Sequence, residues 1–382
     1  MYLNHILNIK KLASSVVLGV FMAFFACNTF AAQHENHEAT AVVATEDTTH
    51  AAHHEGAEAH EGAAAGHEEV FNPTTAILEH IGDAHSWHVV GDISIGLPVI
   101  LFTDKGTEYF SSSKFNHGHD AFQGKYYTYK LVEDKIRVVD AAGNVDKATS
   151  YKIYDFSITK NVLALWIAGI LLLVIFMSVA SAYKKRVGKA PKGLQSFIEP
   201  IIVFVRDEIA RPNIGYRYQR YMPILLTIFF FIWINNLLGL VPIFPGGANV
   251  TGNILMTFVL STIVLLVVNF SANKYYWKHI LLPDVPLWLY PIMIPVELIG
   301  VISKPFALMI RLYANISAGH IIVLSLISLI FIFKSMFIAP VSVAFVLFMD
   351  VLELLVAFLQ AFIFTMLTAL FIGTAVEEHH AH

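Results

Sequence analysis

Residues 307–320 read ALMIRLYANISAGH and place an arginine, Arg311, inside a segment that otherwise has the composition of a lipid-buried helix. An ionised side chain near the centre of a bilayer costs at least about 2.5–3.5 kcal/mol on insertion scales. A chain keeps such a group where it faces a protein interior or a watery path. Arg311 therefore indicates function. The formal charges between residues 285 and 376 are Glu297, Lys304, Arg311, Lys334, Asp350 and Glu353.

The composition of the whole chain predicts a membrane protein. Of its 382 residues, 56% are hydrophobic and only 14% are charged, and the mean hydropathy is +0.61. Soluble domains carry about 25% charged residues. The net charge of −4 indicates no nucleic-acid partner, and a single cysteine, Cys27, excludes an intrachain disulfide. The sequence contains no P-loop or glycine-rich dinucleotide motif between a strand and a helix, so we expect no cofactor.

The N-terminus has the pattern of an export signal, predicted over residues 1–31. Lys10 and Lys11 precede an apolar run that ends at Ala26, and Thr29 and Ala31 fit the −3 and −1 positions of a cleavage site. A lipidation motif ending at Cys27 is the alternative, with an atypical pair of phenylalanines before it. Both interpretations start the mature chain outside the cytoplasm.

Residues 32–70 consist mainly of Ala, His, Glu and Thr and cannot bury a core, so we predict disorder there. One interpretation of the histidines is metal scavenging or pH sensing. The other is a solvated tail without a specific role, which the lack of a ligand-like spacing favours. The seven histidines are His34, His37, His50, His53, His54, His60 and His67.

Residues 71–158 change character, because aromatic and β-branched residues alternate with polar ones. Tyr126 to Val132 shows this alternation, and a second short run from Ile136 to Val139 follows a polar pair. Such runs joined by tight turns predict strands. We therefore expect a small extracytoplasmic β-rich unit.

For residues 159–382 we predict an all-α membrane domain with five transmembrane helices and one amphipathic helix at the membrane surface. Residues 162–182 hold no charge and are long enough to span. Three cations, Lys184, Lys185 and Arg186, follow at once and place that end in the cytoplasm. The apolar spacing over residues 194–210 is typical of a surface helix. The remaining spans are expected at 221–243, 251–273, 287–333 and 339–378, with the C-terminus in the cytoplasm.

Two of these helices carry polar stripes. Glu297, Lys304 and Arg311 are spaced by seven residues, so each lies only about 20° around the helix from the last. Asn315 and Gly319 continue near that face. On the next helix Glu353 and Gln360 are also seven apart, and Asp350 lies one turn before Glu353.

An antiparallel hairpin that turns near residue 336 brings the two stripes together. It sets His320 beside Glu353, and Arg311 beside Gln360 about 13–14 Å further along the axis. A carboxylate next to an imidazole can exchange protons near neutral pH. A guanidinium can hold a carboxylate but does not release a proton. The alternative is that these polar groups simply tie helices together, which the shared register of the whole set disfavours.

The segment from Ser303-Lys304-Pro305 to Gly319-His320 resembles the arginine helix of subunit a of F-type ATP synthases. Residues 359–364, Leu-Gln-Ala-Phe-Ile-Phe, resemble the last helix of that family, and Glu377-Glu378-His379 its end. Residues 235–242 and 249–251 fit its middle spans. The resemblance covers roughly residues 159–379.

The resemblance implies roles for individual residues. Arg311 would face the carboxylate of the rotating c-ring and separate two aqueous half-channels. His320 and Glu353 would be the family's histidine and acid, here in that order. Asn315, Gln360 and Glu297 match further polar positions near the channels. We add Asp350, one turn before Glu353, to the residues expected to take part in proton translocation. Asn249 and Asn253 stand where some members carry an acid.

The resemblance also implies a setting. The chain would be a non-catalytic, multi-pass protein of a bacterial inner membrane that contacts the c-ring, the subunit b peripheral stalk and the bilayer, and moves protons without a metal or cofactor. The extension before residue 159 is not part of the family core. Two rival classes stay open: a self-contained proton-coupled transporter, which usually shows repeated halves, and a metal-uptake protein, which needs more than one histidine in its spans.

Overall fold

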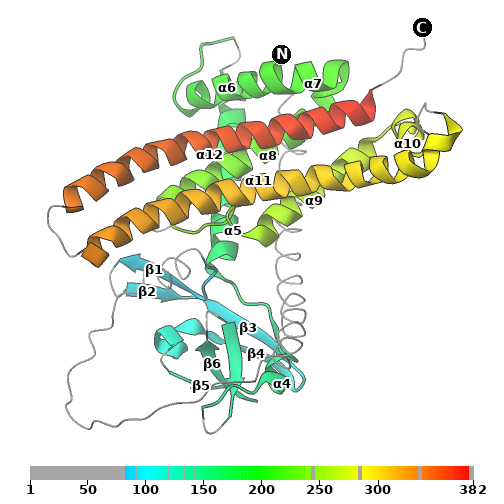
Figure 1. Cartoon of the computed structure of the whole chain (residues 1–382). Coiled ribbons are helices and arrows are strands. Elements are labelled where there is room, and N and C mark those ends of the chain that lie inside the picture. The colour runs from blue at the N-terminus through cyan, green and yellow to red at the C-terminus, as the bar shows by residue number, and fades with distance from the viewer. Residues whose placement is uncertain are drawn as a thin grey trace, which may run out of the picture.

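The computed structural model describes residues 82–377, except for 91–92, 119, 133–134, 141–142, 187, 242–245, 283–285 and 334–337. A β-rich unit comes first, and a bundle of long helices follows it (Figure 1). The predicted signal segment 1–31 with Cys27, and the His-rich residues 32–70, lie outside the described residues.

The β-rich unit contains three small antiparallel sheets. Their strand orders are β1-β2, β4-β3-β8 and β5-β6-β7. Two of the strands, β6 and β7, lie where the alternation of aromatic and polar residues predicted them. The strands are β1 (Ser86–Val90), β2 (Ile93–Gly96), β3 (Pro98–Thr103), β4 (Gly106–Ser111), β5 (Phe122–Gln123), β6 (Thr128–Val132), β7 (Lys135–Val139) and β8 (Tyr154–Asp155), with a 3-10 helix at Ser112–Gly118 and a short helix, α4, at Lys147–Ser150.

A buried carboxylate organises the core of this unit. Glu108 on β4 is 5% exposed and points inward with Leu101, its partner in β3. Its oxygens accept hydrogen bonds of 2.9, 2.9 and 2.8 Å from the backbone N–H groups of Lys125 and Tyr126 and from the hydroxyl of Tyr129. Because a buried carboxylate is stable only when it is hydrogen-bonded, Glu108 fixes the loop between β5 and β6 to β4.

The N-terminal segment of the β-rich unit binds the start of the first membrane helix, α5 (Lys160–Lys185). Asp83 accepts hydrogen bonds from the hydroxyl of Thr159 at 2.8 Å and the N–H of Asn161 at 3.1 Å, as a helix-capping side chain does. Burial raises the pKa of Asp83, and these two hydrogen bonds oppose that rise. Trp87 on β1 is buried in the same apolar cluster as the helices. The unit therefore packs directly against the start of α5.

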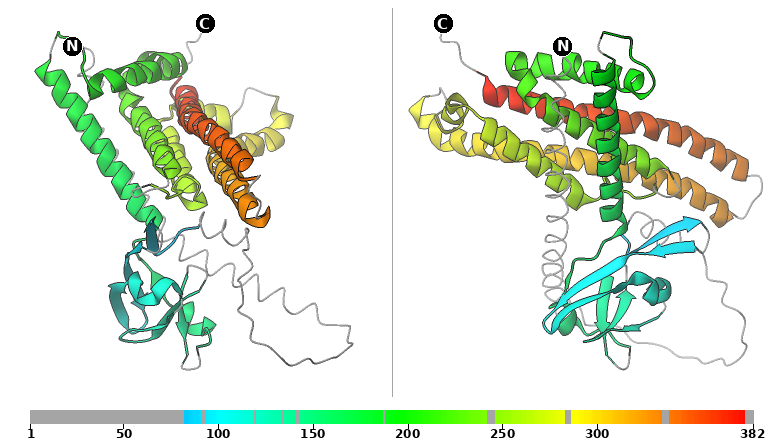
Figure 2. Two further views of the ribbon diagram at one scale, coloured as in Figure 1. Left: turned by 90° about the vertical axis from the view of Figure 1, so that its left-hand side faces the viewer. Right: turned by 180° about the vertical axis from the view of Figure 1, so that it is seen from behind.

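Among the described residues, five stretches of helix are long and apolar enough to cross a membrane, as the sequence predicted. They are Lys160–Lys185, Leu194–Leu240, Ile254–Ser271, Tyr290–Ile330 and Ala339–Val376. The second stretch consists of several elements, and its first part crosses the upper ends of the bundle in Figures 1 and 2. The helices are α6 (Leu194–Phe204), a π-helical turn (Val205–Ala210), α7 (Arg211–Ile214), a 3-10 turn (Gly215–Arg217), α8 (Tyr218–Leu240), α9 (Ile254–Ser271), α10 (Lys274–Leu281), a 3-10 turn (Leu287–Leu289), α11 (Tyr290–Phe333) and α12 (Ile338–Val376).

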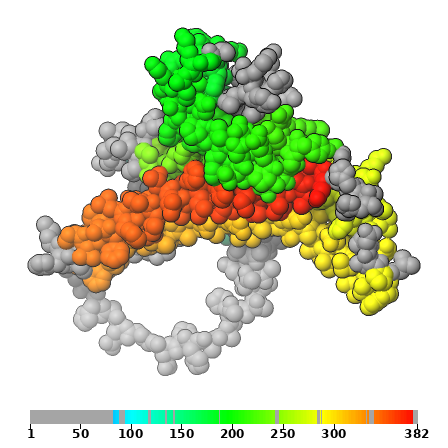
Figure 3. Space-filling view, turned by 90° about the horizontal axis from the view of Figure 1, so that it is seen from above, coloured from blue at the N-terminus to red at the C-terminus, as the bar shows by residue number. Residues whose placement is uncertain are grey.

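Helix α8 lies at the centre of the bundle, and α11 and α12 form an antiparallel pair beside it. Met222, Phe229 and Phe230 of α8 are buried completely or nearly so. The outer sides of α11 and α12 are apolar but exposed, for example Ile299 at 64% and Val351 at 66%. Seen from above, α12 runs across the molecule with α11 along one side and the green segment that contains α6 and α7 along the other (Figure 3). The hairpin therefore offers an apolar flank to lipid or to a partner.

The C-terminal end of α12 is fastened to two neighbours. A Cβ atom on Gly373 would lie 1.9 Å from the carbonyl oxygen of Asn213 in α7, so only glycine fits this contact. Asn273, between α9 and α10, donates its backbone N–H to Ala375 O and its side-chain Nδ2 to Val376 O, both at 2.9 Å. These bonds satisfy carbonyl groups that a helix end leaves without partners.

Candidate functional site

The hairpin of α11 and α12 brings His320 and Glu353 to one cavity, at the height that the predicted register gave. The cavity has a volume of about 20 Å³, which is room for about one water molecule. Glu353 lies directly over Gly319, where a Cβ atom would be 2.9 Å from Glu353 Oε1. The remaining lining comes from Asn236, Leu240, Asn315, Ile316, Val356 and Ala357.

The two titratable side chains sit in different surroundings. Glu353 Oε1 is buried and accepts no hydrogen bond among the described residues. The imidazole of His320 faces α8, where a Cβ atom on Gly239 would lie 3.8 Å from His320 Nε2. An unpaired buried acceptor is costly, so a proton or a donor that reaches Glu353 is bound favourably. The arrangement suits an acid that takes up and passes on protons.

Asn236 of α8 supports this cavity, and the sequence analysis did not select it as a site residue. Its Nδ2 donates to Ala357 O of α12 at 3.2 Å, and its Oδ1 accepts from the hydroxyl of Thr251 at 2.7 Å. Asn236 thereby joins α8, α12 and the loop before α9. A pair of asparagines, Asn235 and Asn236, inside an uncharged span was the signal that could have identified it.

Asn249 belongs to the same loop but does not line the cavity. It is 6% exposed, and its Oδ1 accepts from the N–H of Gly252 at 2.9 Å. The carbonyl of Gly252 accepts a hydrogen bond of 3.3 Å from the hydroxyl of Ser317 on α11. Asn249 therefore shapes the loop that packs behind the cavity.

Gln360, which the predicted register set beside Arg311, has its hydrogen-bond partner one helical turn further along α11. Gln360 Oε1 accepts a hydrogen bond of 3.0 Å from Asn315 Nδ2 instead. Side chains on a helix tilt toward its own N-terminus. In an antiparallel pair, the long Gln360 side chain therefore reaches a residue further along α11 than a comparison of backbone heights suggests. Arg311 is exposed and forms no ion pair among the described residues.

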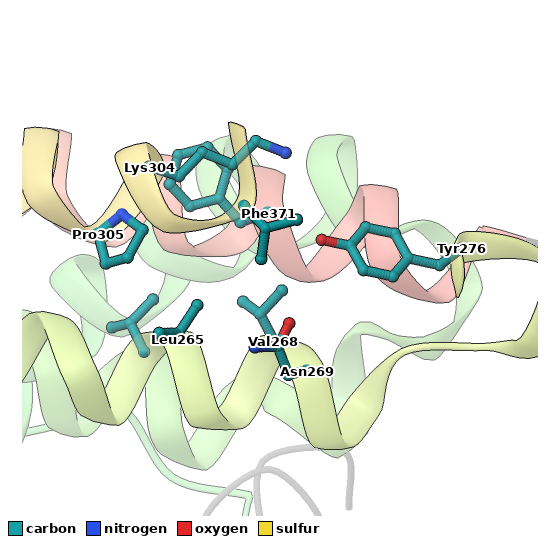
Figure 4. Close-up of a pocket in the computed structure, with 9 residues that line it drawn as sticks. Leu265, Val268, Asn269, Tyr276, Lys304, Pro305 and Phe371 are labelled. Atoms are coloured by element: carbon teal, nitrogen blue, oxygen red, sulfur yellow. The ribbon is translucent and has the colours of Figure 1, made fainter. Parts of the chain in front are cut away.

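Glu297, Lys304 and Asp350 are not brought to the His320 cavity. Lys304 and Phe371 lie at a second, smaller and largely apolar cavity of about 10 Å³ beside Asn269 and Tyr276 (Figure 4). The ammonium group of Lys304 is 5.5 Å from the centre of the Phe371 ring. Glu297 is half-buried on the same helix, and Asp350 is exposed on α12.

The phenol of Tyr276 lies close enough to Glu297 to be affected by its negative charge. Tyr276 belongs to α10, a helix that the sequence analysis did not predict. Burial raises the pKa of its phenol, and the negative charge of Glu297 raises it further. This end of the hairpin thus holds the carboxylate of Glu297, the ammonium group of Lys304 and the phenol of Tyr276 near the end of α12.

Arg311 lies between the two cavities. It is seven residues after Lys304 and nine before His320, which is about 10 Å and 14 Å along the helix. Within the described ranges, no group of three or more His, Cys, Asp or Glu side chains could hold a metal ion. The fold and these polar groups define a multi-pass membrane protein of the ion-translocating class.

Comparison with known proteins agrees with this class. The family model of the ATP synthase A chain matches residues 162–373, and a domain of unknown function (DUF8433) matches residues 76–156. ATP synthase subunit a of Chloroherpeton thalassium is 48% identical over 241 residues, which cover 60% of this chain and 71% of the relative. ATP synthase subunit a 2 of Chlorobaculum tepidum is 46% identical over 237 residues, or 60% and 66% of the two chains.

A third relative extends into the β-rich unit. ATP synthase subunit a of an Anaeromyxobacter species is 38% identical over 334 residues, which cover 84% of this chain and 74% of the relative. Any stretch of that length within the 382 residues includes residues 82–155. The similarity to this protein therefore covers the β-rich unit as well as the helices.

The chain belongs to the ATP synthase A chain family, and its function is that of the proton-translocating stator subunit in the membrane sector of an F-type ATP synthase. It works within that complex, with the c-ring as its partner. None of the matches favours the alternative of a self-contained transporter.

Proposed function

We propose that protons pass from one side of the membrane through the cavity of His320 and Glu353 to a carboxylate of the c-ring, and leave on the Lys304 side of Arg311. One observation carries this proposal: two titratable groups share a cavity, and a permanently charged, exposed Arg311 separates that cavity from a second one on the same helix. Each proton that crosses 100 mV releases about 2.3 kcal/mol.

The side chains divide the work by their chemistry. His320 and Glu353 exchange protons, because an imidazole and a carboxyl group can each both accept and give one. Arg311 attracts the deprotonated ring carboxylate and stays charged, so it binds each carboxylate as it passes without conducting a proton itself. The hydrogen bond between Asn315 and Gln360 keeps α11 and α12 at a fixed separation beside it.

The proposed setting follows from the ends of the helices. The cluster of Lys184, Lys185 and Arg186 at the end of α5 favours a cytoplasmic position for that end in a bacterial inner membrane. The same orientation makes the region before α5 extracytoplasmic and the C-terminus cytoplasmic, with α6 along the cytoplasmic surface. We assign the subunit no catalytic site of its own, and the exposed flank of α5 is available to the subunit b stalk.

The complex itself tests the function. A tagged chain purified in mild detergent should carry the c subunit, subunit b and the ATP-hydrolysing subunits with it, identified by mass spectrometry. In liposomes the chain alone should not move protons against a gradient. A chain that arrives without c subunits and still drives uphill proton uptake would be a transporter instead.

The orientation of the β-rich unit has its own test. Tyr109 on β4 is 74% exposed, so a Tyr109→Cys variant presents an accessible thiol. We expect this thiol to react with a membrane-impermeant maleimide in cells whose outer membrane alone is permeable. A cysteine at Lys189, on the opposite side, should react only after the inner membrane is broken. The reverse labelling pattern would invert the topology, and the proposed entry and exit paths with it.

A further inference from the structure

The last turn of α5 and its link to α6 concentrate positive charge that nothing in the described chain neutralises. Their five cations are exposed, and none forms an ion pair among the described residues. No acidic residue occurs anywhere between Asp155 and Glu199. We call residues 184–186 and 188–192 the basic loop. Its cations are Lys184, Lys185, Arg186, Lys189 and Lys192.

Large apolar side chains are exposed beside the basic loop. Leu194 and Phe197 at the start of α6 are 46% and 61% exposed, although both lie within two residues of the buried Gln195. The ring of Phe197 stacks on Trp233 of α8 with centroids 6.5 Å apart, so its position is fixed rather than free. On α5, Met177 is 59% exposed at the same end of the helix. Cations next to exposed apolar groups are typical of a segment at the boundary of lipid headgroups and acyl chains.

We infer that the basic loop, with Leu194 and Phe197, is a binding surface for anionic phospholipids. The ammonium groups and the guanidinium of Arg186 bind the phosphate oxygens through charge-assisted hydrogen bonds, and the two apolar side chains contact the upper acyl chain. An acidic segment of a partner protein would satisfy the cations equally well. Such a segment gives no reason for Leu194 and Phe197 to be exposed next to them, so the lipid is favoured.

The test is a lipid titration of the assembled complex. The variant Lys189→Gln/Lys192→Gln leaves Lys184, Lys185 and Arg186 in place, so the charges that orient α5 remain. Short-chain phosphatidylglycerol is added to the detergent-purified complex, and bound lipid is counted by native mass spectrometry. Each cation near a membrane contributes about 1 kcal/mol, or about fivefold in affinity. We expect the double variant to bind phosphatidylglycerol about 25-fold more weakly, with phosphatidylcholine binding unchanged.

Two further variants complete the test. Lys147→Gln/Lys152→Gln removes two exposed cations from the β-rich unit and should leave the phosphatidylglycerol titration unchanged. Phe197→Ser keeps all five cations of the basic loop but should still weaken binding, provided that the complex retains its c subunits. An unaltered titration in the basic-loop variant, or an equal loss in the Lys147/Lys152 control, overturns the inference. Loss of a subunit from the complex with lipid binding intact would also overturn it, in favour of an acidic protein partner.

Discussion

Replacing Arg311 with alanine should reduce ATP-driven proton pumping to background while ATP hydrolysis by the soluble sector continues. The guanidinium is exposed on the outer side of α11 and is unpaired among the described residues, so it is free to attract a carboxylate of the ring. Without it, the ring has no fixed charge to hold its ionised carboxylate between the two cavities. Pumping is measured by dye quenching in inverted membrane vesicles, with hydrolysis measured in parallel.

Lysine should not replace Arg311. An ammonium group is a point charge that loses its proton more readily on burial, and it cannot bind a carboxylate with two parallel hydrogen bonds. Arg220→Ala is the matched control, because Arg220 is an exposed arginine at the start of α8 and should leave pumping intact. Wild-type pumping in Arg311→Ala would remove this residue from the mechanism.

Exchanging His320 and Glu353 should restore proton flux that either single change destroys. A positioned acid–base group contributes about 10²–10⁴-fold to a proton transfer, so His320→Glu and Glu353→His should each slow pumping by about a hundredfold or more. The double variant again places one acid and one imidazole at the same cavity, and should regain part of the loss.

Because the cavity is small, the exchanged side chains could disturb packing, and the experiment needs a control for assembly of the complex. Glu353 packs closely against Gly319, where a Cβ atom would lie 2.9 Å from Oε1, so each variant must first be shown to retain its c subunits. The initial rate of pumping in vesicles is then compared among the four proteins. If the double variant is no faster than the slower single variant, His320 and Glu353 do not act as a pair.

The number of spans and the hairpin could be predicted because each rests on long apolar segments and on charges that lipid tolerates poorly. The neighbourhood of His320 and Glu353 followed from the same reasoning, because a turn near residue 336 sets both residues at one height. Gln360 is further from the turn, and its long side chain reaches Asn315 rather than Arg311. A register that compares only the heights of backbone atoms does not include this tilt of the Gln360 side chain.

Other features depended on contacts between distant segments. The capping of α5 by Asp83 joins residues 76 and 78 positions apart, and no local pattern predicts it. Asn236 binds α12 across 121 positions. Helix α10 was not predicted for a different reason: it has only eight residues, too few for a clear periodic pattern. Asn273 immediately before it was an available N-terminal signal.

The fastening of α12 has a mechanical consequence. The helix is 39 residues long, or about 58 Å. Its described hydrogen bonds to other elements lie at Ala357, Gln360, Ala375 and Val376, all at or beyond its midpoint. These hydrogen bonds therefore fix the C-terminal half of α12 and not its N-terminal half. The close contact of Gly373 with α7 lies at this fixed end. When the turning ring pushes on the hairpin, we expect the reaction torque to pass through this fixed end of α12. Loosened contacts at this end would appear as ATP yield lost under load, while passive proton conductance persists.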